Sequence, residues 1–457
     1  MLLGPVFDRF AAKSPVSVMA RALLERALCP QELDVLFERC AEQQYTRELL
    51  FSTTADLLSQ AVCGIRKSVH AAFQAAEDIA VSITSVYNKL AGVEASVSAT
   101  LVRFCGDRLS PVVAALGAAP EWLPGYRARL LDGNHLAASE HRLRETRREA
   151  AGPLPGFCLV ALDAATGLAG DVFPCEGGHA QERALLGDVL AAIRARDLWL
   201  ADRNFCVARF LVGIAARTGF FLIREHQQVP VAAAGRLRPC GRAEAGQVWG
   251  QAVVVTDDEG NTLAVRRVAL LLDEPTRDGE REVVVLTNLP KGDADARAVA
   301  RLYRRRWAIE GRFQEMAVAL HAEIDTLCYP KAALLAFCVG LAASNVLAAL
   351  KAALRAAHGA EAVEEISGYY LADEVSGTYR GMMIALPPEE WLVFRSLTAE
   401  ALAGLLRQWA SRVRLEAFRR HRRGPKKPGC KRKHTKKKPH VSTARLLEQR
   451  KGNKNRV

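Results

Sequence analysis

The stretch GFCLVALDAATGLAGDVFP, residues 156–174, decides the fold that this sequence predicts. Two apolar runs flank a polar turn from Asp163 to Gly167, a pattern typical of a β-hairpin. The apolar run ARLLDGNHL, residues 128–136, precedes the hairpin and predicts another strand. We therefore expect a sheet that begins with three antiparallel strands.

Beyond the hairpin, strands alternate with helices. Residues 179–197 have the apolar spacing of an amphipathic helix, and residues 204–219 predict a second helix that ends at a glycine. The apolar runs at 198–201 and 220–226 predict the strands between and after them. Antiparallel strands followed by this alternation favour an α/β fold with a mixed sheet.

A β-rich block interrupts this alternation at residues 229–289. Two apolar runs surround the turn DDEGN, residues 257–261, and REVVVLTNL, residues 281–289, adds a third strand. The block precedes an arginine-rich segment that has the spacing of a helix. We interpret it as an insertion into the α/β core.

Helical regions flank this core. Residues 16–115 show apolar spacing of three and four, and residues 82–105 predict two short helices. That pair fits a helix-turn-helix, but ordinary helix packing is the favoured interpretation. Residues 332–350 approach the length of a membrane span, but they are rich in alanine and carry Ser344 and Asn345, so we expect a buried core helix.

Composition points to a cytoplasmic protein with a large core. Half of the 457 residues are hydrophobic, and the eleven cysteines form no CxxC pair, which favours buried thiols in a reducing compartment. The first residues, MLLGPVFDRFAAKS, have an early acid and only a short apolar run, so no signal peptide is expected.

The net charge of +13 is concentrated at the end of the chain. Residues 421–457 carry a net charge of +14, so residues 1–420 sum to −1. Such a run repels itself and attracts polyanions, although a generic solubilising or RNA-binding tail is an equally good interpretation. The cations expected to contact DNA here are Lys426, Lys427, Lys431, Arg432, Lys436 and Lys437.

Two aspartates share one context. Asp132 and Asp202 each end an apolar strand and begin a polar turn, LLD-GN and WLAD-RN. Functional groups gather at the carboxyl ends of strands, and two carboxylates there repel each other unless a cation lies between them. Magnesium is suited to such a site because it prefers carboxylate oxygens. For either aspartate alone, a turn or a helix cap is the plainer interpretation.

The segment LYRRRWAIEGRFQEMAVAL, residues 302–320, predicts a helix with one unusual face. At about 100° per residue, five residues fall on one stripe about 100° wide. Arg305 and Arg312 fall on the opposite face. An ordinary i,i+4 ion pair would explain part of this stripe, but not its aromatic residues. The five residues are Tyr303, Arg306, Trp307, Glu310 and Gln314.

These residues carry a family resemblance. The triplet Asp132, Asp202 and Glu310, with the pattern Tyr303-x-x-Arg306-x-x-x-Glu310, resembles the DDE transposases of the insertion sequence 4 family. The phrases LWLADRNF, VVVLTNLP and LYRRRWAIE are similar to signatures of that family, and the β-rich block matches its layout. The resemblance covers roughly residues 120–350.

The chain departs from the family pattern at one position. The family places a lysine seven residues after the glutamate, where this chain has Ala317. A phosphate contact there is either missing or supplied by another residue, such as Gln314 or Arg312.

The resemblance implies a ribonuclease-H-like core in which Asp132, Asp202 and Glu310 bind two divalent metal ions, normally Mg²⁺, with Mn²⁺ as a substitute. Two such ions serve phosphoryl transfer by activating the nucleophile and stabilising the leaving oxygen. It also implies that Tyr303 and Arg306 hold a DNA phosphate. Further residues expected at the DNA are Trp307, stacked on a flipped base or else packed in the core, Gln314, and Arg203, touching DNA or paired with Asp202.

The expected layout has six parts. They are a helical N-terminal domain that binds DNA ends (1–118), the core (119–228 and 290–357, the second part carrying the Glu310 helix), the β-rich insertion (229–289), a helical C-terminal region (358–420) and a basic, disordered tail (421–457).

The expected function is a cut-and-paste DNA transposase of an insertion sequence. Its partners would be the terminal inverted repeats of the element and the target DNA, it would be a dimer on DNA, and it would act in a prokaryotic cytoplasm at the nucleoid. No membrane contact is expected. Two alternatives stay open: an inactive, transposase-derived DNA-binding protein, and a metal-dependent nuclease on the same fold.

Overall fold

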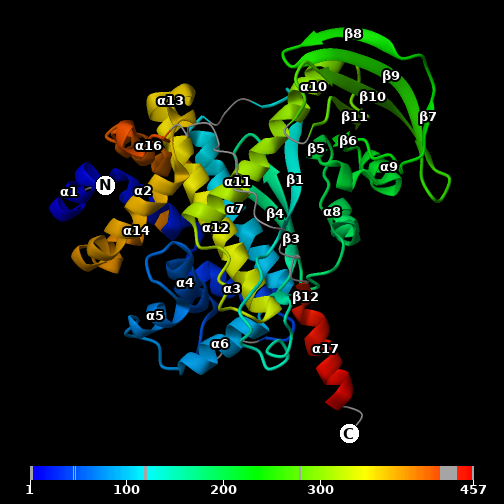
Figure 1. Ribbon diagram of the computed structural model, residues 1–457. Helices are drawn as coiled ribbons and strands as arrows, with labels where there is room; N and C mark the ends of the chain where they lie inside the picture. The colour runs from blue at the N-terminus through cyan, green and yellow to red at the C-terminus, as the bar shows by residue number, and fades with distance from the viewer. Residues whose placement is uncertain are drawn as a thin grey trace.

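A mixed sheet forms the centre of the molecule. The computed structural model describes residues 4–44, 46, 48–117, 121–276, 279–421 and 440–454. Within them, a ten-stranded sheet has the order β4-β3-β1-β5-β6-β11-β10-β9-β7, with β8 paired to β9 (Figure 1). Its strands are β1 (Arg127–His135), β3 (Phe157–Asp163), β4 (Ala169–Cys175), β5 (Asp197–Ala201), β6 (Phe220–Arg224), β7 (Val231–Ala233), β8 (Arg238–Ala243), β9 (Gly246–Thr256), β10 (Thr262–Leu272) and β11 (Glu282–Thr287).

The first five strands form a ribonuclease-H-like core. β3 pairs antiparallel with β1 and β4, and β5 pairs parallel with β1 and β6. The predicted hairpin joins β3 to β4: Asp163 accepts hydrogen bonds from the backbone N–H groups of Ala165 and Thr166, and Gly167 closes the turn at φ 72°. The predicted α/β class with a mixed sheet and helical flanks is confirmed.

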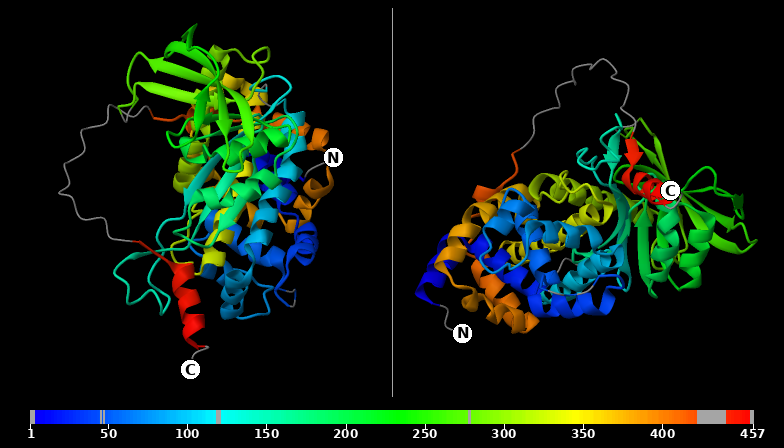
Figure 2. Two further views of the ribbon diagram at one scale, coloured as in Figure 1. Left: turned by 90° about the vertical axis from the view of Figure 1, so that its right-hand side faces the viewer. Right: turned by 90° about the horizontal axis from the view of Figure 1, so that it is seen from below.

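The burial of strand β3 on both faces explains why its sequence is continuously apolar. Its six residues from Phe157 to Leu162 are buried, because both faces of the sheet are covered. Cys158, Val160 and Leu162 join a large cluster on the helical side. Their neighbours along the strand join a second cluster that includes residues of α8 (Leu186–Ala191) and α9 (Ala208–Ala216). Figures 1 and 2 show helices on both sides of the core sheet.

The helical layer on the first face combines both ends of the chain around α12 (Pro330–His358) and α7 (Ala95–Ala115). The segments expected as separate N- and C-terminal regions share this layer and one hydrophobic cluster. The other helices are α1 (Pro5–Lys13), α2 (Pro15–Ala27), α3 (Pro30–Cys40), α4 (Phe51–Val62), α5 (Val69–Gln74), α6 (Ile83–Gly92), α13 (Ala360–Glu364), α14 (Gly368–Ala385), η4 (Pro388–Trp391), α15 (Val393–Ser396), α16 (Ala399–Ala410) and η5 (Leu415–Phe418).

Helix α12 is the buried core helix that the sequence predicts. Its length and mean hydropathy of 2.2 would suit a membrane span, but its most apolar window is 100% buried inside the protein. Asn345 is 1% exposed, and its amide pairs twice with the backbone of Ala169 at the edge of β4, with bonds of 2.7 and 3.0 Å. This amide satisfies a buried sheet edge that would otherwise lack partners.

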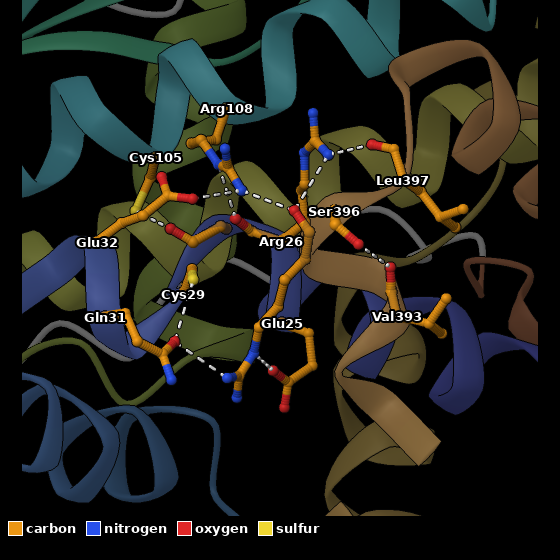
Figure 3. Close-up of polar contacts among 12 residues, drawn as sticks. Glu25, Arg26, Cys29, Gln31, Glu32, Cys105, Arg108, Val393, Ser396 and Leu397 are labelled. Atoms are coloured by element: carbon orange, nitrogen blue, oxygen red, sulfur yellow. Dashed lines mark hydrogen bonds and ion pairs between the residues drawn. The ribbon is translucent and has the colours of Figure 1, made fainter. Parts of the chain in front are cut away.

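Hydrogen bonds and ion pairs of arginine side chains connect the N-terminal helices to the C-terminal ones (Figure 3). Arg108 on α7 donates to the carbonyl of Arg26 at 3.2 Å and to that of Arg395 at 3.0 Å, and it forms an ion pair with Glu32 at 3.1 Å. Arg395 on α15 donates in turn to Glu25 at 2.7 Å. These contacts join α2, α3, α7 and α15 and hold the C-terminal helices against the N-terminal ones.

The β-rich insertion continues the core sheet. β11 pairs antiparallel with β6, with Val285 opposite Arg224 and Thr287 opposite Leu222. β10 and β9 extend the sheet outward from β11. The inserted strands and the core strands are therefore one continuous hydrogen-bonded sheet.

The end of the chain is partly folded, which differs from the expected disorder of residues 421–457. β12 (His440–Ser442) pairs parallel with β2 (Gly152–Leu154), and α17 (Thr443–Lys454) follows. Ser442 and Thr443 are buried, and their short side chains suit the close packing of this junction. Residues 422–439 lie outside the described residues, and with them the six expected DNA contacts Lys426, Lys427, Lys431, Arg432, Lys436 and Lys437.

Candidate active site

Two of the predicted acids lie at neighbouring positions on paired strands: Asp202 directly follows β5, whereas Asp132 lies within β1, which continues to His135 instead of ending in the predicted turn. Leu131 of β1 pairs in parallel register with Ala201 of β5, and Asp132 and Asp202 are the next residues on the two strands. Asp202 also accepts a hydrogen bond of 2.7 Å from the backbone of Arg203 and so caps the short helix η2 (Arg203–Phe205). The capping interpretation and the strand-end position therefore both apply to Asp202.

The predicted helix at 302–320 is not continuous. It is divided into α10 (Ala296–Arg304), the 3₁₀ turn η3 (Arg305–Trp307) and α11 (Ala308–Ala319). A 3₁₀ turn advances about 120° per residue instead of about 100°, so the predicted stripe is distorted at this point. The side chains of Trp307 and Ala317 lie outside the described residues.

The stripe divides into a buried and an exposed part. Tyr303 and Arg306 are 5% and 6% exposed and point into the protein. The side chain of Glu310 is 52% exposed, and Gln314 is exposed as well. Tyr303 and Arg306 thus form the floor of the site, and Glu310 stands at its rim.

Arg306 joins two of the three acids. Its Nη1 donates to Asp132 Oδ2 at 3.3 Å, and its Nη2 donates to Glu310 Oε1 at 2.9 Å. Burial disfavours its charge, but Tyr303, Asp132, Asp202 and Glu310 together raise the pKa of Arg306 above its ordinary value. The i,i+4 pair with Glu310 is therefore part of a larger charge cluster.

Asp132 has the more perturbed environment. Burial raises its pKa to about 6, against the lowering effects of Arg306 and the Gly133 N–H, and the charges of Glu310 and Glu182 raise it further. Because Asp132 is partly desolvated and faces other acids, it favours any additional cation.

Glu182, whose place at a predicted helix start favours a capping role over a metal site, is a fourth acid in this neighbourhood. It lies at the start of η1 (Glu182–Leu185), and its carboxylate accepts a hydrogen bond from Asn204. Gly133 makes room for it: a Cβ at this glycine would lie 1.9 Å from Glu182 Oε1. No spacing in the sequence connects residue 182 to residue 132.

Two of the remaining residues considered for DNA contact, Arg203 and Arg312, have partners within the protein. The guanidinium of Arg203 pairs with Glu280 at 3.3 Å rather than with Asp202. Arg312 donates to the carbonyl of Gly167 at 2.9 Å from the opposite face of α11. Of the two residues considered as substitutes for the missing lysine, Gln314 is exposed near Glu310 and Arg312 is engaged elsewhere.

The donor chemistry of this site fits a divalent cation. Carboxylate oxygens, such as those of Asp132, Asp202 and Glu310, are the ligands that Mg²⁺ prefers. Among the described residues, no three His, Cys, Asp or Glu side chains already surround a common point. The Arg306 guanidinium supplies the positive charge between Asp132 and Glu310, and a metal ion there would replace it. The assignment of metal ligands stays a prediction.

Comparison with protein families agrees with this geometry. Residues 124–346 match the family model of the transposase DDE domain. This part of the chain is similar to transposase DDE domains. The matched range begins just before β1 and ends inside α12, so it includes all three acids and the inserted strands.

Other comparisons add little. No protein of curated function matches the chain. Among solved structures, the cryo-EM structure of the piggyBac transposase synaptic complex with hairpin DNA is 11% identical, with a TM-score of 0.40 over 81% of this chain and 82% of that one. These values are too low for any property of that complex to be transferred to this chain.

Proposed function

We propose that this chain is a cut-and-paste DNA transposase of the insertion sequence 4 family, which cleaves DNA at the ends of its element and joins those ends to target DNA. The transposase DDE domain supports a transposase. The observation that carries the catalytic part is the position of Asp132 and Asp202 directly after the last parallel pair of β1 and β5, with Arg306 linking Asp132 to Glu310.

In this proposal, Asp132, Asp202 and Glu310 hold two divalent ions, Mg²⁺ by preference and Mn²⁺ as a substitute. Such ions lower the pKa of bound water and neutralise charge on the phosphoryl group. Arg306 turns from the carboxylates to a DNA phosphate, which a guanidinium binds through two parallel hydrogen bonds. Tyr303, buried beside it, fixes the orientation of that guanidinium.

The wider assembly follows from the same proposal. The helical N-terminal region, residues 1–118, recognises the terminal inverted repeats, and two copies act together on DNA. The basic segment after residue 421 adds sequence-independent affinity for target DNA. The protein works in a prokaryotic cytoplasm, bound to the nucleoid.

Cleavage of DNA that carries the element ends tests the proposal. The substrate is DNA that carries the two sequences flanking the coding region. The reaction contains about 5 mM Mg²⁺ or Mn²⁺, because weakly held Mg²⁺ sites need concentrations of that order. We expect cleavage at both ends by the unmodified protein and loss of at least about a thousandfold in rate for Asp202→Ala, since metal ligands act as a unit.

Asp188→Ala is the matched control, because Asp188 is an exposed acid on α8. It should cleave at the unmodified rate. Equal cleavage by the Asp202→Ala and Asp188→Ala variants would remove Asp202 from the active site.

A non-catalytic DNA-binding protein is the second candidate. It is favoured by the Arg306 guanidinium, which already neutralises Asp132 and Glu310, and by Ala317 at the position of the family lysine. It predicts tight binding to the element ends with no strand cleavage in either metal. A gel that separates binding from nicking distinguishes the two candidates.

A further inference from the structure

A large cavity lies beside α11, the helix that carries Glu310. It has a volume of about 830 Å³ and lies between α11, the start of α14 and the residues after η5. Gln314 and Gly311 of α11 line it, so the cavity adjoins the acidic site around the circumference of one helix. This volume falls in the range of about 300–1,000 Å³ that small organic ligands occupy.

One wall of the cavity is a row of aromatic rings. Tyr369 is 48% exposed, and its ring meets the edge of Tyr370 at a centroid distance of 5.5 Å. Tyr370 meets His421 at 6.2 Å in the same edge-on manner. A tyrosine exposed at the mouth of a cavity offers its face to another flat ring, and nucleobases stack on such faces.

The other wall carries positive charge. Glu315 is the acid in the lining, and it is already paired with Lys351 and with Arg312 at 3.5 Å. Gly368 permits this arrangement, because a Cβ there would lie 1.5 Å from Glu315 Oε1. Lys351 and Arg312 are thus the main charge partners of Glu315, and the charge of Arg420 makes a smaller contribution.

Arg420 is an exposed cation on this wall. Its Nε donates to the carbonyl of Ile366 at 3.0 Å and its backbone N–H to that of Glu365 at 2.8 Å, which holds the residue in place. No acid forms an ion pair with Arg420 in the part of the chain that the structure describes. A fixed, exposed guanidinium beside an aromatic face matches a phosphate beside a base.

We propose that this cavity binds an unpaired nucleotide of the DNA substrate, with its base against Tyr369 and its phosphate at Arg420. The inference rests on the proposed function, because it identifies the form of DNA bound next to Glu310. A base in a duplex is stacked on both sides and cannot reach the tyrosine ring, so the site selects single-stranded or locally opened DNA. The segment between residues 422 and 438 is not the expected occupant of the cavity, because its ten lysines and arginines carry the same charge as Arg420.

Binding measurements without metal test this site apart from catalysis. The probes are a labelled 12-nucleotide single strand and the duplex of the same sequence, measured by fluorescence anisotropy with EDTA present. We expect Tyr369→Ala to weaken single-strand binding about five- to fiftyfold, the effect of one lost base–aromatic stack. Tyr369→Phe should bind as the unmodified protein does, and duplex binding should change less than about twofold.

Tyr329→Ala is the matched control, because Tyr329 is similarly exposed, at 46%, but lies at the start of α12. Arg420→Gln should weaken single-strand binding and reduce its salt slope by about 0.7, one phosphate contact. A single strand that carries 5-iodouracil should photocrosslink to Tyr369.

Unchanged single-strand affinity in Tyr369→Ala would overturn the proposal, as would equal losses for single strand and duplex, which would indicate a groove for the DNA backbone alone. Crosslinks that map away from Tyr369 would do the same. Because these binding assays contain no metal, a negative result in them would not argue against end cleavage by the acids. Likewise, a failure of end cleavage would not affect the interpretation of the binding assays.

Discussion

Arg306 shows how one side chain changes the interpretation of a motif. In sequence it is one of three consecutive arginines, and only the folded chain shows that its guanidinium bridges Asp132 and Glu310. The neighbouring Arg305 instead lies over the ring of Trp122, 4.0 Å from its centroid. Adjacent residues of the same type thus have unrelated roles.

Arg306 should compete with metal ions for the carboxylates. Arg306→Ala removes the cation between Asp132 and Glu310, so we expect the DNA-free protein to bind Mn²⁺ about five- to thirtyfold more tightly, as a lost competing charge pair of about 1–2 kcal/mol implies. Titration calorimetry measures this directly, with Arg305→Ala as the control that should leave the affinity unchanged. A weaker Mn²⁺ affinity in Arg306→Ala would mean that the arginine organises the site instead of filling it.

Glu94 provides a test of pH dependence far from the active site. It is buried, and one carboxylate oxygen accepts hydrogen bonds from the backbone N–H groups of Glu42, Gln43 and Gln44 at 3.2, 2.6 and 3.1 Å. Burial alone would raise the pKa of Glu94, but these bonds outweigh it and hold the pKa below its ordinary value of 4.5.

Because the folded-state pKa of Glu94 is depressed, its stabilisation is complete above the unfolded-state pKa and is lost as the pH falls through the folded-state value. Glu94→Gln should lower the free energy of unfolding by about 1–3 kcal/mol at pH 7, and the difference should shrink below about pH 4. Urea denaturation at several pH values measures it, with the exposed Glu38→Gln as control. A difference that does not vary with pH would contradict the assigned hydrogen bonds.

At the level of residues, apolar runs predicted the strands but not where each one ends. Asp132 and Asp202 were expected on neighbouring strands because each follows an apolar run, and the parallel register of β1 with β5 places them there, but β1 continues past Asp132 to His135. Glu182 was interpreted as a helix cap, because its approach to Asp132 depends on the missing side chain of Gly133 and not on any spacing. The burial of Arg306 could not be predicted either, because helical periodicity indicates which face of a helix a side chain lies on but not how deeply that face is buried.

At the level of elements, apolar pattern predicted strands better than it predicted helix ends. The hairpin at 156–174 was confirmed because the Asp163 turn is a local arrangement of side chain and backbone. The predicted helix at 179–197 is reduced to η1 and α8, and Arg196, at φ 64°, lies in the turn before β5. Such endings depend on tertiary contacts that periodicity does not contain.

Asn345 carries a prediction about how α12 and the sheet hold each other. Asn345→Leu fits the apolar helix but leaves the Ala169 N–H and carbonyl without partners, so we expect the free energy of unfolding to fall by about 2–4 kcal/mol. Chemical denaturation measures the change, and Asn88→Leu on the exposed face of α6 serves as control. Stability equal to that of the unmodified protein would mean that water replaces the amide at this edge.

At the level of the whole molecule, the sequence predicted the parts but not their joining. Residues 1–118 and 358–420 were expected to be separate regions, yet Arg108 and Arg395 connect them across the fold. The pairing of β12 with β2 was equally unforeseen, because a three-residue strand has no pattern of its own. Contacts between distant segments leave no trace in local spacing.

The basic segment should control how DNA affinity depends on salt. Replacing Lys426, Lys427, Lys431, Arg432, Lys436 and Lys437 by glutamine keeps β12 and α17 in the chain. We expect weaker duplex binding and a salt slope flatter by up to about 5, because each lost phosphate contact removes about 0.9. Binding isotherms between 50 and 300 mM salt, on the order of the range over which such contacts are screened, give the slope. A variant with six arginines is the control, and an unchanged slope in the glutamine variant would exclude these residues from DNA contact.

The junction of β6 with β11 constrains how this chain could be shortened. Excising residues 229–289 would remove the partner of β6 and leave Phe220, Phe221, Leu222 and Ile223 along an open border of unpaired amides. Open borders of that composition recruit strands from other molecules. A descendant that discarded the inserted strands would therefore have to acquire lysine, proline or a covering loop at β6 to avoid aggregation.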